Sequence, residues 1–202
     1  MFEWITGLVE QFGYLGIAVL MFAENVFPPI PSELIMPLAG FTAAQGKLNI
    51  ALVVASGWAG SILGALLWYY VGYWLGLDRL KGFAARHGRW LTMTPDDIED
   101  ARRWFEGHGG TAVFIGRLVP GVRTLISVPA GVARMGLPSF LLYSSLGTLL
   151  WTALLAGAGY LLESGYETVS AYLDPVSNVV VGVIVVVYLY RVVTWRPKGH
   201  EA

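Results

Sequence analysis

The chain has 202 residues, of which 55% are hydrophobic and only 13% are charged, and its formal net charge is −1. With a mean hydropathy of +0.60, this composition is too apolar for an ordinary soluble domain and indicates a membrane protein. The chain has no cysteine, which excludes disulfides, thiolate chemistry and cysteine metal sites.

The first apolar segment ends at a run of prolines. Residues 12–27 carry Glu24 as their only charged residue, and Pro28, Pro29 and Pro31 follow. A helix cannot continue through these prolines, because each removes a backbone donor and restricts the residue before it. No basic residue occurs among the first 27, unlike the start of a cleavable signal peptide. We therefore expect this segment to stay in the mature protein.

A short apolar leg comes after the prolines. It runs from residue 34 to Gly46, about 12 residues or about 18 Å of helix, which is too short for about 30 Å of hydrocarbon. We therefore predict a re-entrant hairpin over residues 12–45, with Glu33 at the start of its second leg. The side of the membrane that holds the N-terminus depends on whether this hairpin includes a full span.

A transmembrane helix and a charged loop are predicted next. Residues 48–77 contain no charged side chain and are long enough to span a bilayer with some tilt. Residues 78–108 carry many charges of both signs and are predicted to be a cytoplasmic amphipathic loop. Thr94 before Pro95 has the pattern of an N-cap, so we expect an interfacial helix there. Binding of anionic headgroups is an alternative role for this loop.

A second re-entrant hairpin is predicted over residues 111–135. The glycines at 107–110 are expected to break the amphipathic stretch before it, and Pro120-Gly121 is expected to form its tip. Arg117 and Arg123 lie on either side of that tip, as the glutamates lie on either side of the first. The hairpin geometry is assigned to Pro28, Pro29, Pro31, Pro120 and Gly121.

Two more apolar segments, 137–162 and 176–195, are predicted to span the membrane. The loop 163–175 between them is acidic, whereas the loop 78–108 and the C-terminal tail are rich in Lys and Arg. Basic loops favour the cytoplasm. The sequence therefore predicts a multi-pass protein of the plasma membrane (the cell inner membrane) with a cytoplasmic C-terminus.

Matching phrases indicate an internal repeat. Pro37-Leu38-Ala39-Gly40 in the first half corresponds to Pro129-Ala130-Gly131 in the second, and Gly72-Tyr73 corresponds to Gly159-Tyr160. A hairpin plus one span crosses the membrane an odd number of times, so two copies must be inverted. We predict an all-α polytopic membrane protein, an inverted repeat of a re-entrant helical hairpin plus a transmembrane helix, with an additional C-terminal transmembrane helix.

The four charged residues near the tips are the candidate site. Ionisable groups are costly in hydrocarbon, so their presence there points to a polar site for a charged cargo. Arg117 and Arg123 have planar donor forks that match a phosphate, and they are predicted to form an anion site. Glu24 and Glu33 are predicted to gain and lose protons and so to couple proton movement to anion movement.

Structural roles are the alternative for these residues. The four charges can pair as two buried salt bridges that lock the hairpin tips together, and Glu33 can complement a helix start. Gly60 and Gly64 permit close helix packing, within the chain or in a possible homodimer. The histidines share no ligand spacing, so no metal site, and no other cofactor, is predicted.

At these residues the chain resembles the DedA family of membrane proteins, also called the SNARE-associated or VTT-domain family. The resemblance covers about residues 10–162 and rests on Glu24 to Glu33 (ENVFPPIPSE), on Phe114-Ile115-Gly116-Arg117 with Pro120 and Arg123, and on Pro129-Ala130-Gly131 with Met135. It implies a fold of two opposed re-entrant hairpins and a role in moving lipids between leaflets. The two acids and the two arginines correspond to the functional charged residues of the family.

The resemblance implies a proton-coupled transporter, or flippase, for undecaprenyl phosphate rather than an enzyme. The expected partners are an anionic polyprenyl phosphate or a phospholipid, membrane lipids and protons, with no nucleic acid. A phosphatidylethanolamine or broad phospholipid scramblase is one alternative, and a proton or ion antiporter is another. An intramembrane lipid phosphatase would need a nucleophile or a metal cluster, and the sequence offers neither.

Overall fold

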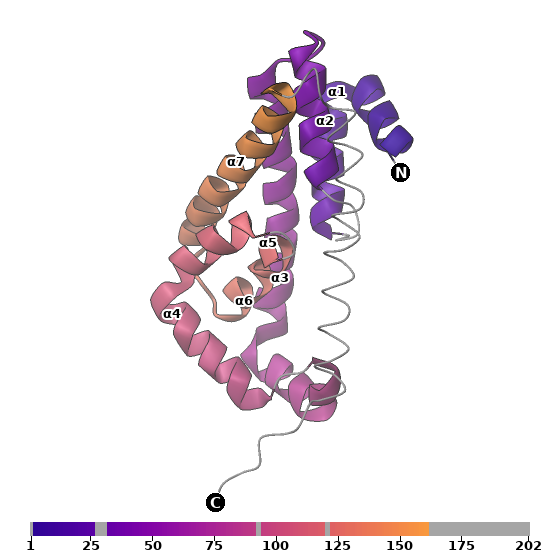
Figure 1. Cartoon of the computed structure of the whole chain (residues 1–202). Coiled ribbons are helices and arrows are strands. Elements are labelled where there is room, and N and C mark those ends of the chain that lie inside the picture. The colour runs from indigo at the N-terminus through magenta and orange to yellow at the C-terminus, as the bar shows by residue number, and fades with distance from the viewer. Residues whose placement is uncertain (1, 27–31, 92–93, 120–121, 162–202) are drawn as a thin grey trace, which may run out of the picture.

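The computed structural model describes residues 2–26, 32–91, 94–119 and 122–161, and this part of the chain contains helices and no strand (Figure 1). In chain order the helices are α1 (Phe2–Val26), α2 (Ser32–Ala44), α3 (Ile50–Leu91), α4 (Pro95–Leu118), α5 (Val122–Leu125), α6 (Ser127–Val132) and α7 (Leu137–Leu161). The all-helical part of the predicted fold class is therefore confirmed. Pro28, Pro29, Pro31, Pro120, Gly121 and the predicted span 176–195 lie outside the described residues.

Within the described residues, two helices are long and apolar enough to cross a membrane, namely residues Ile50–Arg86 of α3 and all of α7. They overlap the predicted spans 48–77 and 137–162 over residues 50–77 and 137–161. Helix α3 continues to Leu91 and turns its direction at Gly76, which has a φ of 69°. The beginning of the predicted charged loop is therefore a continuation of the spanning helix.

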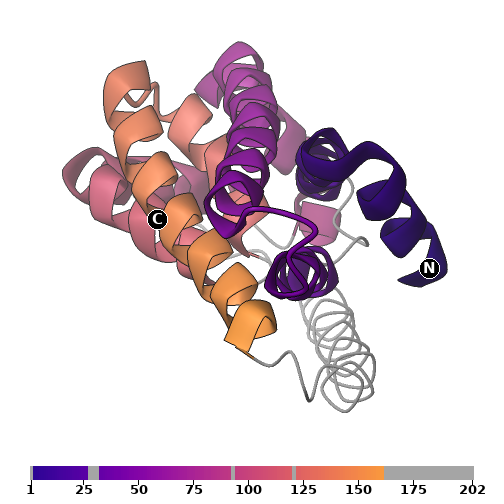
Figure 2. The ribbon, with the colours of Figure 1, turned by 90° about the horizontal axis from the view of Figure 1, so that it is seen from above.

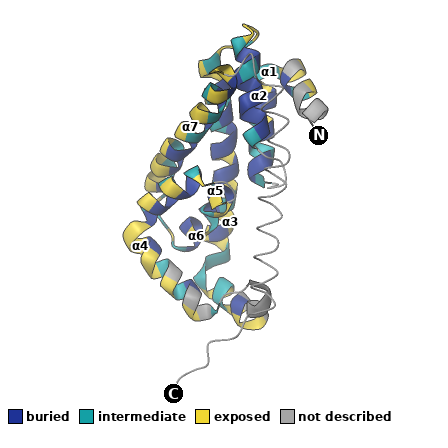
Figure 3. Cartoon of the chain, viewed as in Figure 1, coloured by how far each residue is buried: buried dark blue, intermediate teal, exposed yellow. Residues whose placement is uncertain are grey.

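The distribution of polarity on α7 is the reverse of that on a soluble helix. Leu142, Leu146, Leu150 and Leu154 are exposed on its outer face, whereas Ser144, Thr148 and Thr152 are buried against the other helices (Figure 3). Leucine side chains are stable in contact with lipid tails, and hydroxyl groups are not. This face of α7 is therefore suited to lipid.

Helix α1 bends at Gly13, where φ is 54° and ψ is −126°, and its second half packs on α3. Ile17, Leu20 and Met21 are fully buried in the core that α1 forms with α2 and the start of α3. The close approach depends on glycine, because a Cβ at Gly60 of α3 would collide with the carbonyl oxygen of Ala18. A Cβ at Gly64 would likewise collide with Asn25, so both glycines are used within the chain.

Two helices pack on long helices that lie far from them in sequence. Helix α2 packs on α7, where a Cβ at Gly40 would collide with the Ala156 carbonyl and one at Gly159 with the Pro37 carbonyl. Helix α6 packs on α3 in the corresponding way, because Gly131 meets Tyr69 and Gly72 meets Val128. Figures 1 and 2 show α1 and α2 beside one half of α3, and α4 to α6 beside the other half. The four glycines of the matching phrases thus occupy equivalent contacts.

Helix α4 corrects one expectation. It begins at Pro95, as the Thr94-Pro95 pattern predicts, but runs without a break through the glycines at 107–110 to Leu118. These glycines make room for packing instead, since a Cβ at Gly110 would lie 2.5 Å from the ring of Tyr143 on α7. The predicted leg after residue 121 is divided into the two short helices α5 and α6.

Candidate functional site

The structure brings Glu24 of α1 to Arg123 of α5, although 99 residues separate them in sequence. Nη2 of Arg123 donates to Oε1 of Glu24, and their side chains are only 7% and 5% exposed. Nδ2 of Asn25 donates to the other oxygen of Glu24 over 3.4 Å. The Arg123 guanidinium also lies 5.9 Å from the ring centre of Trp151 on α7. This ion pair is therefore enclosed by side chains from three helices.

Arg117, near the C-terminal end of α4, is a buried cation in a different situation. It is 2% exposed, and its Nη2 donates to Oγ of Ser127 over 2.7 Å. Its Nε has no hydrogen-bond partner, and no acidic residue in the described part of the chain forms an ion pair with it. Gly147 gives it space, because a Cβ there would lie 2.7 Å from Cβ of Arg117. A buried charge without a counter-ion is costly, so this guanidinium has unused capacity for an anion.

Several polar atoms on α7, the helix whose Gly147 and Trp151 lie against the two arginines, are buried without a hydrogen-bond partner among the described residues. On α7 they are Oγ of Ser144, Oγ1 of Thr148 and Nε1 of Trp151. Buried polar groups are nearly always paired, so such a set indicates water or a ligand. These residues recur at helical spacing on one face of an apolar helix. Sequence reasoning missed these residues, although their helical spacing on an apolar helix is a signal that could have identified them.

Oγ of Ser61 on α3 and Oδ1 of Asn25 on α1 are buried in the same unpaired condition. They extend the set of unpaired polar atoms from α7 to the two helices that pack beside the Glu24–Arg123 pair. Thr152 gives the contrast on α7, because its hydroxyl donates to the carbonyl of Thr148 over 2.9 Å.

Glu33 is not joined to this cluster by an ion pair. It lies in the first turn of α2 and is half-buried, and within the described ranges it forms no ion pair with Arg117 or Arg123. Of the two salt bridges that the structural alternative requires, the described residues contain the one between Glu24 and Arg123.

A second charged group joins α3 to α4 at the surface. Glu99 accepts hydrogen bonds from Lys81 of α3 and from Arg102, whose Nη2 lies 2.7 Å from Oε1 of Glu99. Arg102 also pairs with Glu106, one turn further along α4. The hydrogen bonds from Lys81 and Arg102 lower the pKa of Glu99 to about 2. These side chains are partly exposed, so the group is a hydrated network rather than a buried site.

Within the described ranges, no cluster of His, Cys, Asp or Glu is suited to hold a metal ion. The geometry instead offers two buried guanidinium groups and one carboxylate, close to unpaired hydroxyl groups. Such a set can bind an oxyanion and can exchange one proton.

Comparison with known proteins gives one family and several full-length relatives. The profile of the VTT domain matches residues 30–161. A protein of Lactococcus lactis named alkaline phosphatase-like protein is 42% identical over 97% of this chain and 92% of its own length. Undecaprenyl phosphate transporter A of Staphylococcus aureus is 34% identical over 96% of each chain. Protein DedA of Escherichia coli is 28% identical over 92% of this chain and 84% of its own length. No solved structure matches.

Proposed function

Because the chain belongs to the VTT-domain family, which is the DedA family, we propose that it is a proton-coupled transporter of undecaprenyl phosphate in the plasma membrane. The observation that carries this proposal is Arg117, a buried guanidinium with unused donor capacity and no acidic partner among the described residues. A transporter of an anionic lipid needs such a cation, because an anionic headgroup is costly to move through hydrocarbon alone. The name of the Staphylococcus aureus relative supports the choice of lipid.

The site charges favour a phosphate monoester when Glu24 is protonated. Arg117 and Arg123 together carry about two positive charges, and ionised Glu24 removes about one of them. A phosphate monoester carries about −1.5 to −2 near neutral pH. Protonation of Glu24 would release Arg123 from its ion pair and leave two guanidinium groups for the phosphate. Deprotonation would restore the pair and expel the phosphate, which couples proton movement to each crossing.

Glu33 is proposed as a second proton carrier. It starts α2, the helix that follows the first proline run, and it is half-buried. In the ion-paired arrangement it is not engaged with either arginine within the described residues. It can therefore exchange its proton without first breaking the Glu24–Arg123 pair.

The crossed packing of the two halves supports an inverted repeat with two opposed re-entrant hairpins. Helix α2 packs on α7 and α6 packs on α3, with glycines at equivalent contacts. In such repeats, discontinuous helices meet near the bilayer midplane and form the site there. Alternating access would then follow when one half rocks against the other around Arg117 and Arg123. The loop 78–108 and the C-terminal tail, both rich in Lys and Arg, are assigned to the cytoplasm.

The test is transport of labelled undecaprenyl phosphate in proteoliposomes with an imposed pH gradient. Arg117→Ala should lower the rate by about tenfold or more, because it removes the proposed phosphate ligand. Arg117→Lys should restore part of the rate, because it keeps the charge and loses the donor fork. Arg103→Ala is the matched control on the same helix, since Arg103 is 65% exposed, and should transport at the wild-type rate.

Correctly folded Arg117→Ala protein that transports at the wild-type rate would refute the phosphate role. A transport rate that does not change with the imposed pH gradient would refute the proposed proton coupling. Equal movement of phosphatidylethanolamine would instead indicate a scramblase, and ion flux without lipid flux would indicate an antiporter. Release of inorganic phosphate would indicate a phosphatase, an activity for which the wording of the Lactococcus relative's name gives no evidence in this chain.

A further inference from the structure

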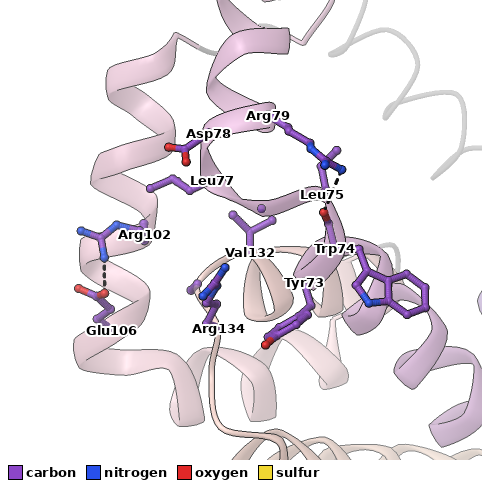
Figure 4. A pocket seen from close by; sticks show the side chains of 12 residues that line it. Tyr73, Trp74, Leu75, Leu77, Asp78, Arg79, Arg102, Glu106, Val132 and Arg134 are labelled. Atoms are coloured by element: carbon purple, nitrogen blue, oxygen red, sulfur yellow. Dashed lines mark hydrogen bonds and ion pairs between the residues drawn. The ribbon is translucent and has the colours of Figure 1, made fainter.

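A hollow of about 560 Å³ lies between the part of α3 around Gly76, the start of the loop after α6 and the middle of α4 (Figure 4). Arginines from these three elements line it, namely Arg79, Arg102 and Arg134, together with Asp78 and Glu106. Glu24, Arg117 and Arg123 do not line it, so it is a different place from the site described above. Its chemistry is cationic and aromatic, because Tyr73 and Trp74 also form its wall.

Arg134 has a backbone conformation that is unfavourable for arginine and is usually occupied by glycine or, less often, by asparagine. Its φ is 52°, and it follows α6 at the position where a helix end turns left-handed. The N–H of Arg134 donates to the Gly131 carbonyl over 2.9 Å, and the N–H of Met135 donates to the Ala130 carbonyl over 3.0 Å. This is the Schellman pattern, which usually has glycine at this position.

The end of α2 uses the ordinary solution. There Gly46 has the positive φ, 77°, and a Cβ at Gly46 would meet nothing within 4 Å. Arginine at the corresponding end of α6 is thus a strained residue where glycine would serve the backbone better. Strained residues are concentrated at ligand clamps and similar sites, so the side chain is the feature to explain.

The strained backbone directs the Arg134 side chain over the hollow. Its guanidinium lies 5.6 Å from the ring centre of Tyr73 and faces the interior of the hollow in Figure 4. Within the described part of the chain, Arg134 forms no ion pair with an acid. Arg79 makes one long hydrogen bond, 3.4 Å to the Trp74 carbonyl. Arg102, by contrast, is already bound to Glu99 and Glu106.

We propose that this hollow is a second binding site, which holds the phosphate of a lipid headgroup at the membrane surface through Arg134 and Arg79. Guanidinium groups with free donors bind phosphate oxygens strongly. The hollow lies at the charged end of the candidate span Ile50–Arg86, next to Tyr73 and Trp74. Aromatic rings and arginines are typical of the depth at which lipid phosphates lie. A lipid phosphate is therefore favoured over free phosphate. The site does not depend on the transport function proposed above.

The test is hydrogen–deuterium exchange on the full-length protein in detergent, with farnesyl phosphate as the probe. We expect protection of amides in residues 73–79 and 132–136, because ligand binding there would close the hollow. Farnesol has the same tail without the phosphate and should give no protection. Inorganic phosphate should bind at least about tenfold more weakly, because it lacks the tail.

The decisive variants are at Arg134. Arg134→Gly removes the guanidinium and the strain together, so it should raise the unfolding temperature. It should also lower by about tenfold or more the affinity for farnesyl phosphate that is read from the protection of residues 73–79, which separates the hollow from a site at Arg117 and Arg123. Arg134→Asn also tolerates the left-handed conformation and should show the same loss of affinity. Arg103→Asn, outside the hollow, is the control and should bind like the wild type.

Three results would overturn the proposal. Equal protection by farnesol would make the hollow an apolar site, and equal affinity for inorganic phosphate would remove the lipid as its ligand. Wild-type affinity in Arg134→Gly, with the unfolding temperature lowered, would mean that Arg134 only stabilises the end of α6. Loss of transport in Arg117→Ala has no bearing on these outcomes, so the two proposals fail separately.

Discussion

The described residues contain ion pairs in two opposite surroundings, buried and exposed. Glu24 and Arg123 are almost fully buried and come from segments 99 residues apart, so their pair exists only when α1 and α5 are packed together. Arg103 and Asp100 are each 65% exposed and lie one turn apart on α4, so their pair needs only that helix. The buried pair therefore depends on tertiary packing, whereas the exposed pair depends only on the local helix.

The energetic consequence differs as well. Exposed pairs contribute little, because water and salt screen them and two long side chains must be ordered. A buried pair has little net value compared with apolar residues, but loss of one partner leaves an uncompensated charge. The stability of the protein is therefore more sensitive to loss of one partner of the buried pair than to loss of one partner of an exposed pair.

The largest expected effect follows from Arg123→Ala. Removal of this partner leaves the Glu24 carboxylate buried, and we expect a loss of about 3 to 5 kcal/mol in the free energy of unfolding. The measurement is reversible unfolding in mixed micelles. Arg103→Ala, the exposed counterpart, should cost less than about 1 kcal/mol.

A double-mutant cycle sharpens this prediction. Glu24→Gln combined with Arg123→Ala should lose less stability than Arg123→Ala alone, because the neutral amide does not leave a buried charge. If Arg123→Ala lowers the free energy of unfolding as little as Arg103→Ala does, the buried pair behaves like a hydrated pair. The predicted difference in stability between the buried and the exposed pair is then wrong.

The next effect concerns two threonines on the buried face of α7. The Thr148 hydroxyl is buried without a partner among the described residues, whereas the Thr152 hydroxyl donates to a backbone carbonyl. Thr152→Val should cost about 1 kcal/mol of stability. Thr148→Val should be neutral or stabilising, because it removes an unpaired polar group, yet it should slow lipid transport.

Unfolding and transport assays on both variants check this prediction together. A Thr148→Val protein that loses stability as Thr152→Val does would show that its hydroxyl is paired in the folded protein. An unchanged transport rate in Thr148→Val would remove the unpaired hydroxyl groups from the translocation path.

Local sequence signals predicted the parts of the fold that depend on local physics. The absence of charge over residues 48–77 was sufficient to predict a helix long enough to span, and Thr94-Pro95 was sufficient to predict the start of α4. The glycines at 107–110 misled the interpretation, because glycine marks both helix breaks and close contacts. Only the partner decides between these roles, and here it is Tyr143 of α7.

The sequence named candidate site residues but not their arrangement. The cost of charge in an apolar segment identified Glu24, Arg117 and Arg123, and the structure brings Glu24 and Arg123 together. The sequence could not indicate which acid pairs with which arginine, since that depends on how α1 and α5 pack. It also gave no sign of the left-handed backbone at Arg134, because that position usually belongs to glycine.

The smallest effect is the pH dependence of the surface network. The hydrogen bonds that Lys81 and Arg102 donate to Glu99 lower its pKa from the ordinary value of 4.5 to about 2. A lowered pKa in the folded state stabilises the protein above the unfolded value, and this stabilisation is lost as the pH falls from about 4.5 to about 2. We therefore expect no contribution of Glu99 to the pH dependence of stability between pH 8 and pH 6.

Thermal unfolding of the wild type and of Glu99→Gln, measured from neutral pH down to about pH 2, isolates the contribution of Glu99. Other carboxylates also titrate below pH 5, but they are common to both proteins, so the difference in unfolding temperature belongs to Glu99. That difference should favour the wild type at neutral pH and shrink as the pH approaches 2. A difference that stays constant with pH would mean that the Lys81 and Arg102 contacts do not depend on the charge of Glu99. The contacts between α3 and α4 would then be held by packing alone.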